Sequence, residues 1–400
     1  MSKQNHESRK HALLSASGAS RWLTCTPSAR LEEKFTESKS SIYADEGTLA
    51  HEFADLNLHW IFATEATDYK VREAELKKLR RHPLYSPEME DEVEKYTNYV
   101  AETFKEARAK TKDAKLLIEQ RLDFSHLVEQ GFGTGDACIV ADGVLDIIDL
   151  KYGKGVVVHA EENPQLKLYG AGALRAFELE YDIHTVKLTI VQPRLDHVST
   201  FEISVKDLEK WGEEVVKPKA VQAYIGEGNQ VAGDHCKWCK VKPMCKTLAE
   251  KNMDLAKHDF ADPHLLNEKD LINIFEQQPM LVDWVSAVAD YILKEALKGK
   301  KWLGYKLVEG RSNRRFSSEE RVVDLLTKEG FSIDKFANTK LKGLGDLEKL
   351  LGKSKFEPVL GDLIIKPPGA PTLVPLADKR PEFNSAEQAK ADFGTDTEEL

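Results

Sequence analysis

The chain has 400 residues, of which 41% are apolar and 31% are charged, and its formal net charge is −10 at pH 7. This length and apolar content are enough to bury a substantial core, and they suggest two domains. The sequence has no run of about 18 apolar residues and no charged N-terminal stretch followed by an apolar one, so we expect a soluble, cytoplasmic protein without membrane contact. If such an acidic chain binds nucleic acid, its Lys and Arg side chains must be concentrated where the phosphates lie.

The first 255 residues alternate between helical and strand patterns, which is typical of an α/β domain. Helices are predicted at 47–63, at 86–110 after a Ser86-Pro87 start signal, at 163–177 and at 206–225. Strands are predicted at 115–124, 135–141, 144–152, 186–191 and 198–205. We therefore place the first domain at residues 1–255.

Helical patterns dominate the rest of the chain, at 265–275, 280–297, 318–328 and 344–351. We expect a smaller, mainly helical C-terminal domain at residues 256–377. Residues 366–375 are proline-rich and predicted to be extended. The polar tail at 378–400 is expected to be disordered.

The pair Asp142-Gly143 lies between two apolar runs and predicts a two-residue hairpin turn. Counting outward from this turn, Asp136 faces Asp149, with the two Cβ atoms about 5 Å apart. Strand side chains alternate with a period of two, so Lys151 shares a face with Asp149. The three side chains are therefore expected to converge at the open end of the hairpin.

Two carboxylates this close favour a divalent cation between them, because both cannot easily ionise alone. Oxygen ligands suit Mg²⁺ or Mn²⁺, and Lys151 beside them could orient or help deprotonate an attacking water. These are the minimal parts for hydrolysis of a phosphodiester. Exposed carboxylates near hairpin ends are also common without any such role.

The strings GTGDACIVADGVLDIIDLKYGKG and QLKLYG resemble the RecB-like branch of the PD-(D/E)xK nucleases. Asp136 matches the first metal ligand of that family, and Asp149-Leu150-Lys151 matches its (D/E)xK element. The resemblance implies an α/β fold with a restriction-endonuclease-like core, in which helices flank a mixed central sheet. It also implies metal-dependent cleavage of DNA.

Other parts of the family pattern follow in the expected order. Gln165 and Tyr169 match the QxxxY helix, which by resemblance borders the metal and contacts DNA or orients the lysine. The segment Gly47–His51 is similar to the GTxxH helix, whose histidine reaches the same metal. Glu119, on the preceding strand, is a further candidate carboxylate ligand. Each of these residues alone also fits an ordinary surface or core position.

Three of the five cysteines, Cys236, Cys239 and Cys245, fall within ten residues of each other in a chain without a secretion signal. This spacing argues against a disulfide framework and for a metal or cluster site. The arrangement with Cys25 upstream resembles that of the Cas4 and AddB nucleases. By resemblance, these four cysteines hold a [4Fe–4S] cluster that joins the two ends of the nuclease domain.

A structural Zn²⁺ is the alternative to the cluster, since four thiolates also make a closed zinc site. In that case His235 could replace Cys25 in a set of three cysteines and one histidine.

The segment 298–316 mixes basic and aromatic residues, which suits phosphate contact and stacking on bases. Lys301, Arg311, Arg314 and Arg315 are its candidate DNA-binding residues. The alternative is an exposed segment whose aromatic side chains serve the local core.

The stretch from SASGASRWLTC to EGRSNRRF resembles a phage-associated family of unassigned function that carries RecB-like motifs. The hypothesis is a Mg²⁺- or Mn²⁺-dependent deoxyribonuclease, an exonuclease of phage-type recombination or DNA processing in a bacterial host, working beside a single-strand-binding or annealing protein. A second hypothesis is a catalytically silent nuclease-fold protein that binds DNA or acts as a scaffold. A third is a zinc-stabilised phage structural protein.

Overall fold

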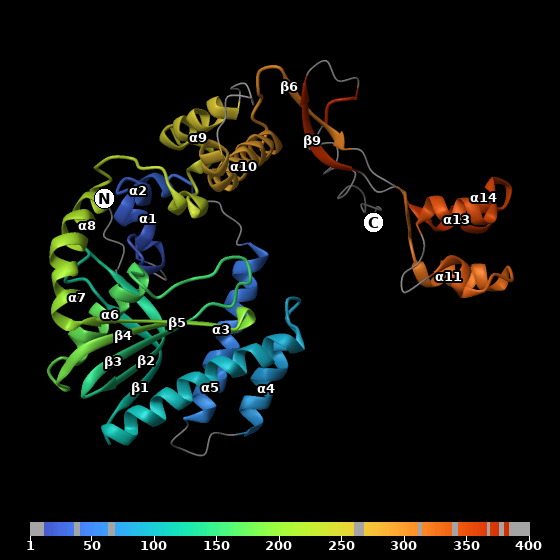
Figure 1. The fold of residues 1–400 in the computed structure, drawn as a ribbon. Helices are drawn as coiled ribbons and strands as arrows, with labels where there is room; N and C mark the ends of the chain where they lie inside the picture. The colour runs from blue at the N-terminus through green and yellow to red at the C-terminus, as the bar shows by residue number, and fades with distance from the viewer. Residues whose placement is uncertain are drawn as a thin grey trace, which may run out of the picture. The chain divides into compact units, whose positions relative to one another are not determined.

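The computed structural model describes residues 12–35, 41–62, 69–259, 268–310, 314–337, 343–365, 369–375 and 380–383. The chain divides into two units, residues 1–284 and residues 285–400 (Figure 1). The domain limits from the sequence, 1–255, 256–377 and 378–400, stay predictions. Residues 378–379 and 384–400 of the tail lie outside the described part.

A mixed sheet of five strands, in the order β1-β2-β3-β4-β5, forms the centre of the first unit (Figure 1). The strands are β1 (Lys115–Asp123), β2 (Phe132–Ala141), β3 (Gly143–Leu150), β4 (Ile183–Gln192) and β5 (His197–Ser204). β3 and β4 are parallel and connected by α6 (Pro164–Phe177), whereas all other neighbours are antiparallel. This topology, with a helical C-terminal region, confirms the predicted fold class of a mixed sheet flanked by helices.

The hairpin between β2 and β3 has the predicted register. Ala141 pairs with Val144, and Ala137 pairs with Ile148. Gly143 has a φ of 88°, a conformation that glycine adopts without steric cost. The paired residues end at Ala137 and Ile148, and Asp136 and Asp149 are the next residues along the two strands.

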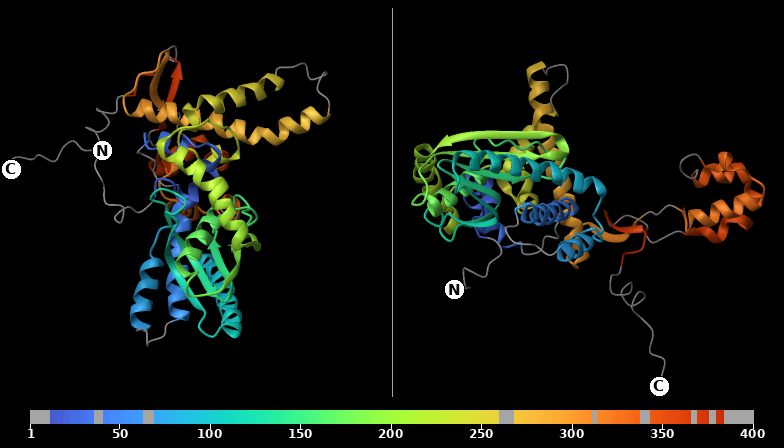
Figure 2. Two further views of the ribbon diagram at one scale, coloured as in Figure 1. Left: turned by 90° about the vertical axis from the view of Figure 1, so that its left-hand side faces the viewer. Right: turned by 90° about the horizontal axis from the view of Figure 1, so that it is seen from below.

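Helices cover both faces of the sheet (Figures 1 and 2). The helices on one side are α1 (Ala19–Thr24), α2 (Ser28–Glu32), α6, α7 (Val205–Trp211) and α8 (Lys217–Ile225), and those on the other are α3 (Ile42–Ile61), α4 (Tyr69–Leu79) and α5 (Pro87–Lys110). Alternate side chains of the central strands enter two separate cores: Cys138 and Ile147 pack with α6, and Ile139 and Ile148 pack with α3 and α5. Because both faces of the sheet are buried, the sequences of β2 and β3 are nearly continuous runs of apolar residues.

α6 begins where the sequence predicts a helix. The Asn163 side chain accepts hydrogen bonds from the N–H groups of Gln165 and Leu166, and Pro164 occupies the first helical position. Both features stabilise a helix start, because the first N–H groups of a helix have no partner within it. The cap therefore fixes the position of Gln165 on the first turn.

The helix predicted at 206–225 is interrupted. Two α-helices, α7 and α8, flank a π-helical turn, η4 (Gly212–Val216). A Cβ at Gly212 would lie 2.9 Å from a Leu127 methyl group, so the turn is held close to the loop after β1. Such single-turn insertions leave no clear mark on apolar periodicity.

The chain then passes through η3 (Pro193–Leu195) between β4 and β5, and after α8 through η5 (Asp234–Trp238), η6 (Lys242–Met244), α9 (Lys246–Asp259) and α10 (Glu268–Leu297). The sequence predicts two separate helices at 265–275 and 280–297. The interruption between them is wrong, because α10 continues through Pro279. Proline removes one helical hydrogen bond but does not end a helix whose apolar pattern continues on both sides. Residues 265–267 lie outside the described residues.

The second unit contains a small helical core and two short sheets. Its elements after α10 are β6 (Tyr305–Gly310), β7 (Arg315–Phe316), α11 (Glu319–Lys328), α12 (Ile333–Phe336), α13 (Leu344–Leu351), α14 (Lys353–Leu360), η8 (Gly361–Leu363), β8 (Ile364–Ile365) and β9 (Gly369–Pro375). Phe336, Leu347 and Phe356 are buried together in this core. The predicted extended segment at 366–375 contains β9, which pairs with β6. No helix in the described part of the chain is long and apolar enough to cross a membrane.

Candidate metal centre

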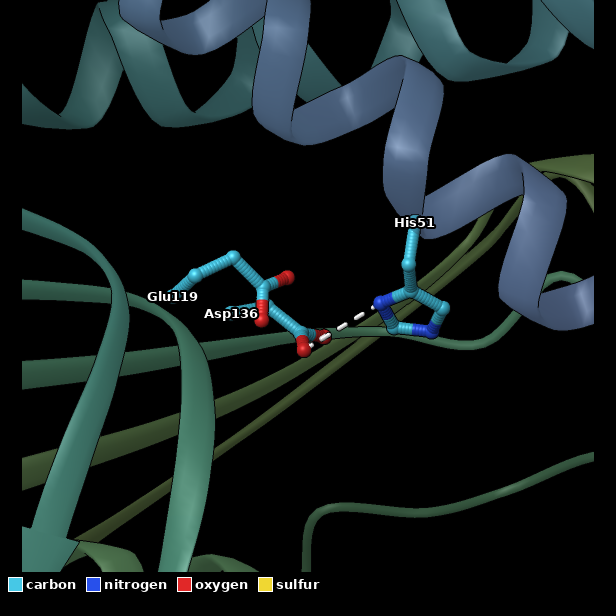
Figure 3. A group of neighbouring side chains, drawn as sticks. All are labelled: His51, Glu119 and Asp136. Atoms are coloured by element: carbon cyan, nitrogen blue, oxygen red, sulfur yellow. Dashed lines mark ion pairs between the residues drawn. The ribbon is translucent and has the colours of Figure 1, made fainter. Parts of the chain in front are cut away.

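Side chains from three elements converge beside β1 and β2 (Figure 3). His51 comes from α3, Glu119 from β1 and Asp136 from β2, and one ligand atom of each lies within 4.8 Å of the others. The imidazole of His51 faces the Asp136 carboxyl group, with 3.2 Å between Nδ1 and Oδ1 (Figure 3). One imidazole and two carboxyl groups form a donor set that could bind a divalent metal ion.

Glu119 lies at an irregularity in β1. The pairs Ile118–Ala137 and Gln120–Gly135 flank it, but Glu119 itself has a left-handed φ of 46°. A non-glycine residue in this conformation costs on the order of 1 kcal/mol. The strain accompanies a carboxyl group directed toward Asp136.

The charged groups of this centre shift one another's pKa values. Burial alone would lower the pKa of His51, but the adjacent Asp136 carboxylate overrides it and raises this pKa to about 9. Burial opposes ionisation of Asp136, yet the His51 cation and Lys151 hold the pKa of Asp136 below its ordinary value. Partial burial and the charge of Asp136 raise the pKa of Glu119 to about 7. A metal ion bound by these groups would therefore have to displace the proton of His51 near neutral pH.

Asp149 and Lys151 lie next to this group, at the end of β3. Lys151 Nζ is 2.8 Å from Asp149 Oδ2, and it donates a hydrogen bond of 3.3 Å to Gln165 Oε1. Asp136 Oδ2 accepts a 2.7 Å hydrogen bond from the backbone N–H of Leu150, which joins the ends of β2 and β3. The hairpin thus brings its two predicted carboxyl groups and its predicted lysine together.

Lys151 is held as a cation in this environment. Burial would lower its pKa, but Asp149 and Asp136 outweigh that effect and raise it. Asp149 is only 2% exposed, and burial raises its pKa although the Lys151 charge works in the other direction. Of the two facing carboxyl groups, Asp136 is therefore the stronger acid.

Gln165 and Tyr169 form one side of the site from α6. Gln165 Nε2 donates hydrogen bonds to Asp149 Oδ1 at 3.1 Å and to the Tyr169 hydroxyl at 3.3 Å. Tyr169 is 6% exposed, so its ring is part of the core while its hydroxyl reaches the polar group. The four-residue spacing places both side chains on the same helix face, as expected.

The close approach of α6 to β2 at Gly133 gives a test of this packing. A Cβ on Gly133 would lie 2.6 Å from Tyr169 Cε1, closer than atoms can approach. We expect Gly133→Ala to lower the free energy of unfolding by about 1–3 kcal/mol as the ring is displaced. Gly47→Ala is the control, since a Cβ there meets nothing within 4 Å. Because Gly47 lies in the interior of α3, Gly47→Ala should raise the free energy of unfolding by at most about 1 kcal/mol. Urea unfolding of both variants measures the effects, and unchanged stability of Gly133→Ala would contradict this packing.

The four candidate cluster ligands share one location. Cys25, Cys236, Cys239 and Cys245, with His235, line one small cavity, and all four are free thiols. Among the described residues, their sulfur atoms do not form a group as close as that of His51, Glu119 and Asp136. The thiols are therefore neighbours without a closed single-ion geometry, and their role as ligands stays a prediction.

The N-terminal segment is fixed to the cysteine segment and to α8 by direct contacts. Arg21 pairs with Glu32 at 2.7 Å, and Glu32 Oε1 accepts a hydrogen bond from the backbone N–H of Lys240. Arg30 Nε donates to the Tyr224 carbonyl, and the Thr26 hydroxyl donates to the Glu227 carbonyl. These contacts bring Cys25 to the other cysteines across more than two hundred residues of sequence.

The basic segment is divided between two small sheets. β6 pairs with β9, and β7 pairs with β8. Lys301 is exposed just before β6, an Arg314 guanidinium nitrogen lies 3.8 Å from a Glu348 carboxylate oxygen, and Arg315 is exposed on β7. Arg311 lies outside the described residues. The role of these residues in DNA binding is untested and stays a prediction.

The aromatic residues of this segment have packing roles. The Trp302 indole N–H donates to the Ile292 carbonyl, and its ring lies edge-on to Tyr291. Lys300 Nζ lies 4.1 Å from the centre of the Trp302 ring. Phe316 packs against the helical core of the second unit. Stacking on bases by Trp302 or Phe316 would require these contacts to open.

Two residues near the site were missed from the sequence. The buried side chain of Gln192 donates to the carbonyls of Gly153 and Val156, and it accepts from the N–H of Val158, so it fixes the loop after Lys151. A glutamine at the end of a strand gives only a weak sequence signal. Its partners can be identified only from the conformation of the loop at residues 153–158.

The second missed residue, Arg194, connects α3 to the end of β3. Its Nη1 is 3.1 Å from Glu46 Oε1, and its guanidinium lies 4.5 Å from the centre of the Tyr152 ring. This contact holds the helix that carries His51. Because Arg194 and these two partners come from three separate parts of the sequence, spacing alone could not reveal this contact.

Comparison with known proteins identifies the family of this chain, and the description of that family gives no function. Residues 11–381 match the family described as "Protein of unknown function (DUF2800)", and the chain belongs to this family. A crystal structure from Eubacterium rectale described as a "Putative exonuclease" is similar at 13% identity and a TM-score of 0.32, covering 60% of this chain and 91% of that one. A structure designated SSO0001 is similar at 15% identity and a TM-score of 0.23, covering 56% of this chain and 95% of that one. Likenesses this distant do not establish a shared activity.

Proposed function

We propose that this protein is a metal-dependent DNA nuclease of the PD-(D/E)xK type, of the RecB-like branch. The observation that supports this most is the convergence of His51, Glu119 and Asp136 beside Lys151, within one hairpin and its covering helix. A carboxylate pair, an imidazole and a half-buried ammonium group together suit hydrolysis of a phosphodiester better than a structural role. A structural salt bridge needs no strained Glu119 and no three-ligand donor set.

The residues present fit Mg²⁺ or Mn²⁺. His51, Glu119 and Asp136 would hold the ion, with Asp149 as a further candidate ligand. Carboxylate oxygens with one imidazole favour hard divalent ions, and a phosphate oxygen and waters would complete the shell. When bound, such an ion supplies Lewis-acid polarisation of the phosphate and a more acidic water.

The protein's own groups would orient the reaction. Lys151, kept protonated by Asp149, donates to the attacking water or to a phosphate oxygen as negative charge develops there. Gln165 would keep the Lys151 and Asp149 side chains in position, because it accepts a hydrogen bond from Lys151 and donates one to Asp149. Hydrolysis joins the water oxygen to phosphorus and breaks one P–O bond, which leaves a phosphate and a hydroxyl end.

We further propose an exonuclease of phage-type recombination or DNA processing. This rests on the similarity of the sequence to phage-associated proteins with RecB-like motifs. DNA is then the substrate, with an annealing or single-strand-binding protein as partner. Lys301, Arg311, Arg314 and Arg315 are proposed phosphate contacts.

The four cysteines fit a [4Fe–4S] cluster in a stabilising role. They supply four thiolates around one cavity, and Arg21 and Lys242 line the same cavity, where positive charge favours an anionic cluster. The cluster would add covalent links between the N-terminal segment and the cysteine segment. A structural Zn²⁺ bound by the same residues is the alternative.

We expect protein purified without oxygen to be brown, and Cys25→Ser to lose this colour together with bound iron. Iron and zinc analysis of wild type, Cys25→Ser and Cys138→Ser measures this. Cys138 is the control, because it is buried in the α6 core away from the cavity. Bound zinc without iron would support the structural zinc site, and the absence of both metals would refute a metal role for these cysteines.

The proposed activity is tested by incubating end-labelled linear DNA and closed circular DNA with Mg²⁺, Mn²⁺ or EDTA. We expect metal-dependent degradation of the linear DNA alone, absent in Lys151→Ala. DNA binding without cleavage under any of these ions would instead support a silent nuclease-fold protein. Cleavage by Lys151→Ala at the wild-type rate would refute the site.

A further inference from the structure

Trp238 is the most exposed of the six tryptophans of the chain. It is 68% exposed, whereas the other five are buried or half-buried. An indole left in water forgoes the free energy that burial of so large a ring would supply. Trp302 and Phe316, whose rings the sequence suggested for stacking on bases, are instead engaged in packing. Trp238 is therefore the tryptophan whose ring a ligand can reach.

Lysines surround this ring in a stretch without acidic residues. Residues 236–246 contain no Asp or Glu, although the net charge of the chain is −10, and they contain four lysines, Lys237, Lys240, Lys242 and Lys246. Lys242 and Lys246 each pair with a nearby carboxylate. Lys237 and Lys240 are exposed, and neither forms an ion pair with a carboxylate in the described part of the chain. Two ammonium groups next to the ring are thus available to an anion.

The backbone that carries Trp238 is held by other parts of the chain. The Arg21 guanidinium donates to the Trp238 carbonyl at 3.4 Å, and the backbone N–H of Lys240 donates to Glu32 Oε1 at 2.8 Å. These contacts come from α1 and α2, beside which this stretch lies (Figure 1). A ring on a fixed backbone loses little conformational freedom when a ligand stacks on it, so the position is organised before binding.

The ring and the charges lie within one small area. Lys237 Nζ is 5.3 Å from the centre of the Trp238 ring, and Lys240 follows two residues later. A single nucleic-acid strand offers both matching groups, because every base has a flat face that stacks on an aromatic ring and the phosphates beside it are anions. In a duplex the faces of the bases are covered by their neighbours. The combination therefore favours a single strand over a duplex.

We propose that Trp238, Lys237 and Lys240 form a contact site for single-stranded DNA. One base stacks on the indole, and the two ammonium groups contact the flanking phosphates. The choice of DNA as the nucleic acid rests on the proposed function. The contact itself requires neither cleavage nor the group formed by His51, Glu119 and Asp136, to which none of the three residues belongs.

Fluorescence anisotropy of labelled oligonucleotides, without added divalent ions, tests the stacking contact. We expect Trp238→Leu, which keeps an apolar side chain but no ring, to bind a thymidine oligonucleotide roughly 5- to 150-fold more weakly than the wild type. Trp238→Phe keeps a ring and should recover most of this affinity. Wild type and Trp238→Leu should bind an abasic oligonucleotide equally, because it has the phosphates but no bases.

Trp60→Leu is the matched control for the loss of a tryptophan. The Trp60 ring is half-buried on α3 beneath the Arg72 guanidinium, so this variant should bind the thymidine oligonucleotide as the wild type does. Thermal unfolding and metal content of each variant verify the fold of the cysteine-containing stretch.

The salt dependence of binding tests the two lysines. Each lost phosphate contact lowers the slope of log affinity against log salt concentration by about 0.7 for a single strand. We expect this reduction in Lys237→Gln and in Lys240→Gln. Lys206→Gln should keep the wild-type slope, because Lys206 is an exposed lysine on α7, away from this stretch.

Four results would overturn the proposal. They are wild-type affinity in Trp238→Leu, an equal loss of affinity for the thymidine and abasic strands, unchanged salt slopes in both lysine variants, and a wild type that binds no single strand. Degradation of linear DNA without any Trp238-dependent binding would refute this contact site alone. Trp238-dependent binding without cleavage under any divalent ion would refute only the proposed nuclease function.

Discussion

Replacing Asp136 with Asn is expected to lower metal-dependent DNA cleavage by roughly 10²–10⁴-fold. Asp136 contacts His51 and accepts the backbone hydrogen bond of Leu150, and it is the more acidic of the two facing carboxyl groups. The amide has the same shape but no charge, so the metal ion loses a ligand while the hairpin keeps its geometry. Cleavage rates at saturating metal and DNA measure the effect.

Asp146→Asn is the matched control for this prediction. Asp146 is a buried acid on the same hairpin, and its carboxyl group lies 3.5 Å from Lys187 Nζ, outside the metal-ligand group. We expect Asp146→Asn to change stability but to leave cleavage within a fewfold of wild type. Equal loss of cleavage in both variants would show that the effect comes from the fold and not from the site.

Metal affinity is expected to rise steeply with pH, by roughly tenfold or more for each pH unit between about 6 and 8. Glu119, with a pKa of about 7, and His51, with a pKa of about 9, hold protons that a bound ion must displace. As pH rises through these values, fewer protons compete, so affinity increases and then levels off above about pH 9. Calorimetric titration with Mg²⁺ at several pH values measures the slope.

Two single substitutions separate the contributions to this slope. His51→Gln should bind the metal ion more weakly. Its metal affinity should depend on pH only through Glu119, so the affinity should stop rising above about pH 7. Glu119→Gln should keep the His51 dependence up to about pH 9. Affinity that does not vary with pH in the wild type would mean that the ion binds elsewhere.

The hairpin could be predicted from sequence because a short-range rule determines it. An Asp-Gly turn fixes which residues face each other, and a period of two then places Asp136, Asp149 and Lys151 together. The structure has this register. Gln165 and Tyr169 could be placed through the family resemblance and the helix spacing, since Asn163 and Pro164 also mark the helix start.

Other features depend on tertiary contacts and left little local signal. The left-handed backbone of Glu119 is stable only because the neighbouring strands hold it, and no residue preference predicts it. The contact of Arg194 with Glu46 joins segments about 150 residues apart. The expectation that a proline separates two helices was also wrong, because α10 continues through Pro279 where the apolar pattern on both sides outweighs one lost hydrogen bond.

The most direct test of the central claim is the anomalous scattering of Mn²⁺ in crystals of the wild-type protein. We predict a peak within coordination distance of His51, Glu119 and Asp136, absent in crystals of Asp136→Asn grown in the same way. A peak found only at surface carboxylates, in crystals of protein that degrades DNA, would contradict the account and place the active site elsewhere.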